Sequence, residues 1–199
     1  MKILELQFPK TINDAGLILK QYGYKKISKV SRYASVYYKE GEKTVLKLFN
    51  KKDIAYISFV EFCLHHQDNT HLPKFSKNAI KIKDTNYFAV RTEILKKCPE
   101  NVGKMLTDYF DGMVYIKRKY GSFVEFQQEN QMLIYDTLYY IFQNDDKINK
   151  FLSWVKNNSL FETFNMIIEQ FNGKFSFDMH SDNLMLRGST IVIIDPIQP

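Results

Sequence analysis

The sequence of 199 residues is poor in cysteine, proline and glycine, with two, five and eight of these residues. Two cysteines, Cys63 and Cys98, are too few for a disulfide framework or a cysteine-rich zinc site, and they are typical of reduced thiols in a cytoplasmic protein. No run of about 18 apolar residues is present, and the first residues lack the pattern of a secretory signal. We therefore expect a cytoplasmic protein with no membrane-spanning part.

Positive charge is only mildly in excess of negative charge. Lys and Arg number 28 against 22 Asp and Glu, which gives a net charge of +6. This balance favours an acidic partner. The basic residues are scattered, apart from one cluster at Lys117, Arg118 and Lys119. A solvated helix face explains this cluster better than a nucleic-acid site, so a nucleic-acid binder remains an alternative that rests on charge alone.

The order of hydrophobic patterns predicts an α+β fold with two lobes. The first lobe, residues 1–95, has hairpins and one main helix, and the second, residues 96–199, is mostly helical and ends in a hairpin. The predicted helices cover residues 11–23, 51–67 and several stretches within 101–171. Among these stretches are one near 125–143 and one near 159–171. The predicted strands cover residues 25–30, 34–39, 43–49, 78–84, 87–95, 183–187 and 191–194.

The residues 177–196, FDMHSDNLMLRGSTIVIIDP, hold the most informative polar pattern. Asp178 precedes Asn183 by five positions, and a hairpin turned at Gly188 separates Asn183 from Asp195. Such a hairpin would bring the three oxygen-bearing side chains to one end of a short sheet. Carboxylate and amide oxygens suit Mg²⁺, which takes few protein ligands and keeps phosphate and water as the others. Each residue alone is common in loops, but the combined spacing predicts a metal site.

This segment resembles the protein-kinase superfamily, whose members have a catalytic Asp, an Asn five residues later and a metal-binding Asp after a β-hairpin. The resemblance implies a bilobal protein-kinase-like fold with an antiparallel sheet in the N-terminal lobe and a reduced C-terminal lobe. It implies ATP and Mg²⁺ or Mn²⁺ as cofactors. It also implies Asp178 as the catalytic base, Asn183 and Asp195 as metal ligands, and His180 as a hydrogen-bond partner of the transferring phosphoryl group.

The segment departs from ordinary protein kinases at several positions. Ser176-Phe177 replaces the His-Arg before the catalytic Asp, His180 replaces a Lys, and Pro196 replaces the Phe after the metal-binding Asp. The Asp-x-His-x-x-Asn motif is similar to that of aminoglycoside and choline phosphotransferases. The whole phrase is most similar to small serine/threonine protein kinases encoded in the early region of podoviruses, which implies action in the host cytoplasm.

The N-terminal lobe has candidates for the family's nucleotide-binding elements in the required order. Ser31 and Ala34 stand where the phosphate-covering loop of the family has glycines, with Tyr33 at the tip and Val36 against adenine. The resemblance assigns Lys47, in the strand VLKLF, to the α- and β-phosphates of ATP.

Two further elements complete the expected nucleotide site. Glu61 lies on the next predicted helix and would orient Lys47 through an ion pair, although an exposed Glu61 on the polar face is the alternative. The strand VRTEIL resembles the hinge, which would place Thr92 behind the adenine and let Glu93 to Leu95 offer backbone hydrogen bonds to the base.

These resemblances predict an ATP- and Mg²⁺- or Mn²⁺-dependent kinase that phosphorylates serine or threonine in host or cellular proteins. Two alternatives remain open. A small-molecule kinase would need an acidic acceptor pocket, which the sequence does not reveal. A pseudokinase that only binds proteins is favoured by the missing loop glycines and the short stretch after Asp195, but the retained Lys47, Asp178, Asn183 and Asp195 argue against it.

Overall fold

The computed structural model describes residues 12–27, 34–82, 85–155 and 158–199. The chain divides into two compact units, Met1–Leu95 with Gln198–Pro199, and Lys96–Ile197. The predicted α+β class is confirmed, with an antiparallel sheet in the first unit and five helices among the described residues of the second. None of the helices in the described part of the chain is long and apolar enough to cross a membrane.

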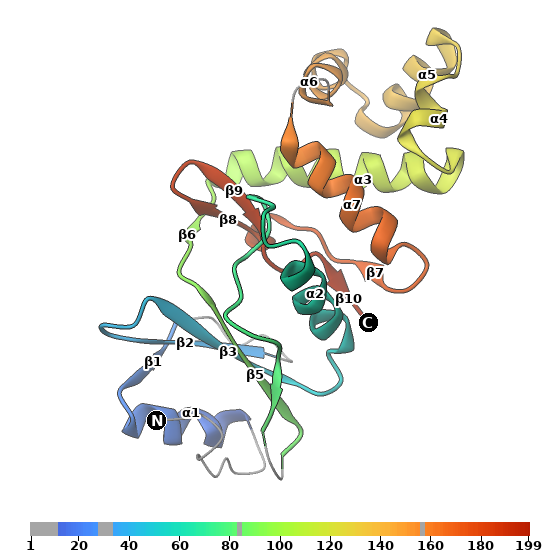
Figure 1. The fold of residues 1–199 in the computed structure, drawn as a ribbon. Coiled ribbons are helices and arrows are strands. Elements are labelled where there is room, and N and C mark those ends of the chain that lie inside the picture. Colours follow the sequence, from blue (N-terminus) through green and yellow to red (C-terminus); the bar gives the residue numbers. More distant parts are fainter. Residues whose placement is uncertain (1–11, 28–33, 83–84, 156–157) are drawn as a thin grey trace. The chain divides into compact units, whose positions relative to one another are not determined.

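The N-terminal unit is a five-stranded antiparallel sheet with a helix on each face (Figure 1). The strand order is β1-β2-β3-β5-β4. The helices are α1 (Ile12–Gln21) and α2 (Ile54–His65), and the strands are β1 (Tyr24–Lys26), β2 (Ala34–Lys39), β3 (Thr44–Asn50), β4 (Ile80–Lys81) and β5 (Tyr87–Glu93).

Alternation along β3 separates the two faces of this sheet, because successive strand residues point to opposite sides. Leu46 and Leu48 are fully buried in a cluster with Leu19 of α1. Phe49 instead packs its ring edge-on against Tyr56 of α2, at 5.0 Å between centroids. Helix α2 begins where the side chain of Asp53 accepts a hydrogen bond from the Tyr56 N–H, which caps the helix N-terminus.

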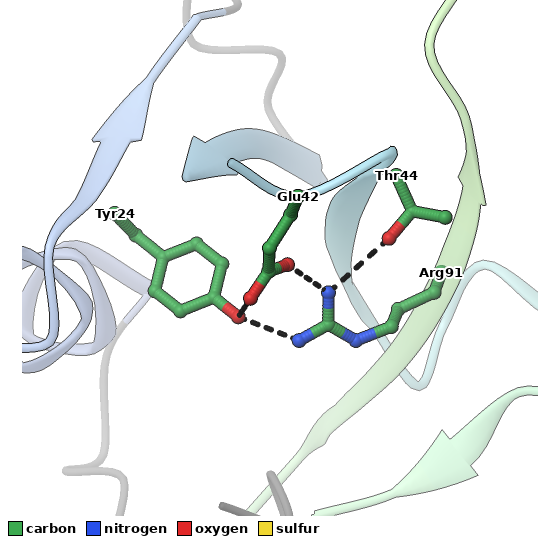
Figure 2. A network of polar contacts seen from close by, with 4 residues as sticks. All are labelled: Tyr24, Glu42, Thr44 and Arg91. Atoms are coloured by element: carbon green, nitrogen blue, oxygen red, sulfur yellow. Dashed lines mark hydrogen bonds and ion pairs between the residues drawn. The ribbon is translucent and has the colours of Figure 1, made fainter. Parts of the chain in front are cut away.

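A polar network on β1, β3 and β5 fastens three strands of the sheet together (Figure 2). Arg91 donates hydrogen bonds to Glu42, to Thr44 at 3.3 Å and to the Tyr24 hydroxyl at 2.5 Å. Tyr24 in turn donates to Glu42 at 3.0 Å. Burial alone would raise the pKa of Glu42, but the hydrogen bonds from Arg91 and Tyr24 outweigh it and hold this pKa below its ordinary value.

The C-terminal unit is built on five helices and short strands. The helices are α3 (Glu100–Tyr120), α4 (Phe123–Gln127), α5 (Gln131–Phe142), α6 (Asp145–Val155) and α7 (Ser159–Phe171). The strands are β6 (Lys96–Lys97), β7 (Ser176–Phe177), β8 (Leu184–Arg187), β9 (Thr190–Ile193) and β10 (Ile197–Gln198). Strand β8 lies between β6 and β9, and β7 pairs with β10.

Aromatic side chains fill the core between the helices of this unit. Tyr109 and Phe110 of α3 are buried against Phe151 of α6 and Phe164 of α7, respectively. The single helix predicted near residues 125–143 is wrong, because α4 and α5 are separate. The side chain of Asn130 accepts a hydrogen bond from the Leu133 N–H and caps a new helix there, which explains the break.

Candidate active site

The predicted hairpin β8–β9 is present and places Asn183 and Asp195 at the same end. Leu184 pairs with Ile193 in its antiparallel register, and Gly188 turns the chain with φ of +62°. Beyond this pair, the Ile194 N–H donates to the Asn183 carbonyl at 2.9 Å. Asn183 ends a single 3₁₀ turn, Ser181–Asn183, and Asp195 follows β9 directly after Ile194.

Two further hydrogen bonds join Asp178 to Pro196 and to Asn183. The Asp178 N–H donates to the Pro196 carbonyl at 2.9 Å, and the side-chain Nδ2 of Asn183 donates to the Asp178 carbonyl at 2.6 Å. Asp195 therefore lies between Ile194, which is bonded to Asn183, and Pro196, which is bonded to Asp178. Two backbone bonds and one side-chain bond thus bring the three predicted residues together, although they belong to three different segments.

The donor set fits a magnesium-type ion held by few protein ligands. Asn183 is 8% exposed, and because its Nδ2 is engaged, its Oδ1 is the side-chain atom left to accept a ligand. No group of three or more His, Cys, Asp or Glu side chains converges among the described residues. Asn183 and Asp195 would therefore hold the ion as a pair, with nucleotide phosphates and water as its other ligands.

Asp178 and His180 are both accessible to solvent. Their side chains are 46% and 48% exposed, and His180 Nε2 lies 4.0 Å from Asp178 Oδ2. Asp182, between them and Asn183 in the chain, instead pairs with Lys97 at 3.1 Å on the surface. The loop therefore presents one carboxylate, that of Asp178, beside an imidazole, and turns the other carboxylate toward β6.

Lys47 lies on the α2 side of the N-terminal sheet. Its strand neighbours are Val36 on β2 and Val90 on β5, and it is only 9% exposed. The Lys47 Nζ lies 3.2 Å from the ring centroid of Tyr56. An ammonium group over a ring face is attracted by the ring's electron density, by up to about 2 kcal/mol when both groups are shielded from water.

The structure favours the alternative of an exposed Glu61 over the predicted ion pair with Lys47. Glu61 is exposed on α2. Tyr56 and Glu61 are five positions apart on α2, which turns them about 140° from each other around the helix axis. Because Tyr56 faces Lys47, Glu61 faces away from it, as the alternative of an exposed Glu61 expected.

The other predicted nucleotide-site residues fall into three groups. Ser31 and Tyr33 lie outside the described residues. Ala34 and Val36 are alternate residues of β2, and Val36 pairs with Lys47, so both lie on the α2 side of the sheet with it. Thr92 pairs with Val45 and shares this face too.

The hinge assignment stays a prediction, and Glu93 makes two hydrogen bonds to Lys74. Its N–H donates to the Lys74 carbonyl at 3.2 Å, and its carboxylate accepts from the Lys74 N–H at 2.8 Å. Thr92 also donates its hydroxyl to the Lys74 carbonyl, at 3.1 Å. The Glu93 N–H is therefore used inside the protein and is not free for a base, whereas Leu95 lies beyond the end of β5 and remains a candidate.

Two residues near the catalytic loop and Lys47 escaped the sequence prediction. The sequence around Tyr56 gives no sign of a functional role, because an aromatic residue on an apolar helix is expected to be part of the core. Gly103 of α3 does give a signal, since a lone glycine inside a helix often marks a close approach of another segment. Here a Cβ at Gly103 would lie 2.8 Å from the Cβ of Ser181, so α3 packs directly against the candidate catalytic loop, residues 178–183.

Comparisons with known proteins show which family the chain is similar to. Residues 13–198 match the model of the family described as "Bacteriophage T7 protein kinase 0.7". The search of curated proteins gave no match. Among solved structures, the chain is similar to a spectinomycin phosphotransferase in complex with ADP and spectinomycin, at 14% identity and a TM-score of 0.40. The match covers 88% of this chain and 65% of that protein, so the chain spans somewhat less than two thirds of its length.

Proposed function

Because the chain belongs to the bacteriophage T7 protein kinase 0.7 family, we propose that it transfers the γ-phosphoryl group of ATP to serine or threonine hydroxyls of cellular proteins. The observation that supports this most directly is the pair of hydrogen bonds, from Asp178 to Pro196 and from Asn183 to Asp178, that holds Asp195 beside both residues. The family description names a protein kinase, which is the class of enzyme that we expect.

Phosphoryl transfer asks the protein for positioning and charge stabilisation more than for covalent chemistry. In the proposed reaction, Asp178 accepts a hydrogen bond from the acceptor hydroxyl and takes its proton as the oxygen attacks the γ-phosphorus. The bond from this phosphorus to the β-phosphate oxygen breaks, and ADP leaves. His180 donates a hydrogen bond to the transferring phosphoryl group from beside Asp178.

Positive charge would balance the charge on the nucleotide. Asn183 and Asp195 would hold Mg²⁺ or Mn²⁺, which supplies positive charge to the phosphates when bound. Lys47 would pair with the α- and β-phosphates, and Tyr56 would keep its ammonium group in place until then. Val36, Ala34 and Thr92 share the face of Lys47 and would contact the nucleoside, and Leu95 would offer its backbone to the base.

The test compares four proteins with labelled ATP, Mg²⁺ or Mn²⁺, and a cell lysate as the source of acceptors. Asp178→Asn should reduce transfer by about a hundredfold or more, the usual contribution of a positioned base, while leaving nucleotide binding intact. Asp195→Asn should abolish the metal dependence of nucleotide binding.

Asp182→Asn is the matched control, because Asp182 lies in the same loop but points to Lys97 on the surface. It should transfer phosphate as the wild type does. Wild-type rates from Asp178→Asn and Asp195→Asn would refute the assignment. Nucleotide binding without transfer by the wild type would instead favour a protein that only binds its partners.

A further inference from the structure

A groove leads away from the catalytic loop within the C-terminal unit. Its volume is ≈ 730 Å³, and its lining comes from the first half of α3, the start of α6, and His180 and Ser181. A second hollow of ≈ 460 Å³ shares Met105, Tyr109 and Lys150 with it and reaches Trp154. The two hollows therefore border each other along α3 and α6, and we call them together the α3–α6 groove.

The floor of the α3–α6 groove is apolar. Met105 is 40% exposed there, although it belongs to a helix whose other face is buried. The Tyr109 ring packs against Trp154 at 5.1 Å between centroids, and Trp154 rests on Phe161 and Phe164 behind it. A flexible thioether beside fixed aromatic rings is a surface that adapts to large apolar side chains.

The rim of the groove carries charges that already compensate one another. Lys147 of α6 reaches Asp108 of α3 at 2.8 Å, and Lys150 pairs with Asp146 at 2.6 Å. Such exposed pairs contribute little to stability and open easily. Because each lysine of α6 that lines the groove has a neighbouring aspartate, the rim selects weakly for charge, and the apolar floor is the part that can discriminate between occupants.

The groove is open to solvent, which favours a polypeptide over a small molecule as its occupant. A pocket for a small ligand buries about 70–90% of it among enclosing side chains. Here the lining residues Met105, Lys147 and Lys150 are themselves well exposed. An open groove that starts at the catalytic loop suits an extended chain, which lies along it and continues past both ends.

We propose that the α3–α6 groove binds an extended segment of the acceptor protein through a large apolar side chain. This inference rests on the proposed kinase function. The helix rises about 1.5 Å per residue, so Tyr109 lies about 9 Å along α3 from Gly103, which touches the catalytic loop. An extended chain advances about 3.3 Å per residue. The apolar side chain therefore lies two to four positions from the acceptor hydroxyl.

The experiment uses peptide mixtures with a fixed serine and randomised neighbours, followed by single peptides. The wild type should select Leu, Met or Phe over Ala at one position two to four residues from the serine. Met105→Lys should lose about tenfold or more in kcat/KM for the apolar peptide, mainly through KM, since a mismatched apolar contact has effects of this size. It should change little for the peptide that carries Ala there.

Met132→Lys is the matched control, because Met132 is 77% exposed on α5 and does not line the groove. ATP turnover without acceptor is measured for all three proteins and should be equal. If the wild type phosphorylates the peptides without apolar preference, or Met105→Lys keeps that preference, the groove inference is wrong while the kinase function stands. If the wild type transfers phosphate to no acceptor and turns over no ATP, both fail.

Discussion

Replacing Gly103 by alanine should impair the reaction more than it impairs the fold. The added Cβ would lie 2.8 Å from the Cβ of Ser181 and 3.2 Å from its Cα, where ordinary contact begins at 3.4 Å. The helix and the catalytic loop must therefore separate by about 0.6 Å, the difference between 3.4 and 2.8 Å. Ser181 begins the turn that ends at Asn183, so the shift reaches the candidate metal ligand.

Two opposing effects on stability nearly cancel in this variant. Alanine stabilises a helix interior by about 1 kcal/mol relative to glycine. Overpacking at a close contact destabilises by about 1–3 kcal/mol. The net loss is therefore between zero and about 2 kcal/mol, which leaves the protein folded. Misplacing reacting groups by about 1 Å can cost a hundredfold in rate, so a shift of about 0.6 Å predicts a loss of about ten- to a hundredfold in kcat.

The assay measures kcat, KM for ATP and the melting temperature for Gly103→Ala, Ser181→Gly and the double variant. Ser181→Gly removes the atom at 2.8 Å and leaves the Cα at 3.2 Å, so the double variant should regain much of the lost kcat. Coupling between the two changes is expected because they share one contact. Full kcat in Gly103→Ala, or strictly additive losses in the double variant, would refute the reasoning.

Two more predictions concern the N-terminal unit. Because the pKa of Glu42 is lowered in the folded state, its contribution to stability is present above the unfolded-state pKa and is lost as pH falls through the folded-state value. Urea unfolding in this acidic range should therefore show a loss in the wild type that is smaller in Glu42→Gln and undiminished in Glu40→Gln, the exposed control. For nucleotide binding, Tyr56→Leu should weaken ATP affinity because it removes the ring over Lys47, whereas Tyr56→Phe and Glu61→Ala should bind as the wild type does. A larger loss in Glu61→Ala than in Tyr56→Leu would restore the ion-pair hypothesis.

Local sequence signals predicted the elements that carry the site. The predicted strands 34–39 and 43–49 match the β2–β3 hairpin, whose register places Val36 opposite Lys47. The apolar strand that runs into Asp195 and the Gly188 turn predicted the second hairpin. Both are short-range features, in which residues close in sequence determine the pairing, so a single sequence suffices to find them.

The orientation of helix α2 could not be predicted in the same way. Its residues are apolar almost all round, so periodicity does not reveal which side meets the sheet. Ile54 is 56% exposed while Tyr56 is 2% exposed, although both are large and apolar in character. Burial of an aromatic ring under Lys47 was decided by packing against Phe49 and Phe75, which are distant in sequence from each other.

The segment before Asp178 explains how the loop does without the His-Arg of ordinary protein kinases. Phe177 stands in place of the arginine, and its ring packs edge-on against Phe110 of α3 at 5.3 Å between centroids. On the other side of Asp178, the loop meets α3 again where Ser181 contacts Gly103. Apolar and steric contacts with one long helix therefore position the loop from both ends. Phe177 makes its contact without the phosphate partner that an arginine at this position would need. Helix α3 also lines the proposed acceptor groove. An occupant of that groove would therefore act on Asp178 through α3.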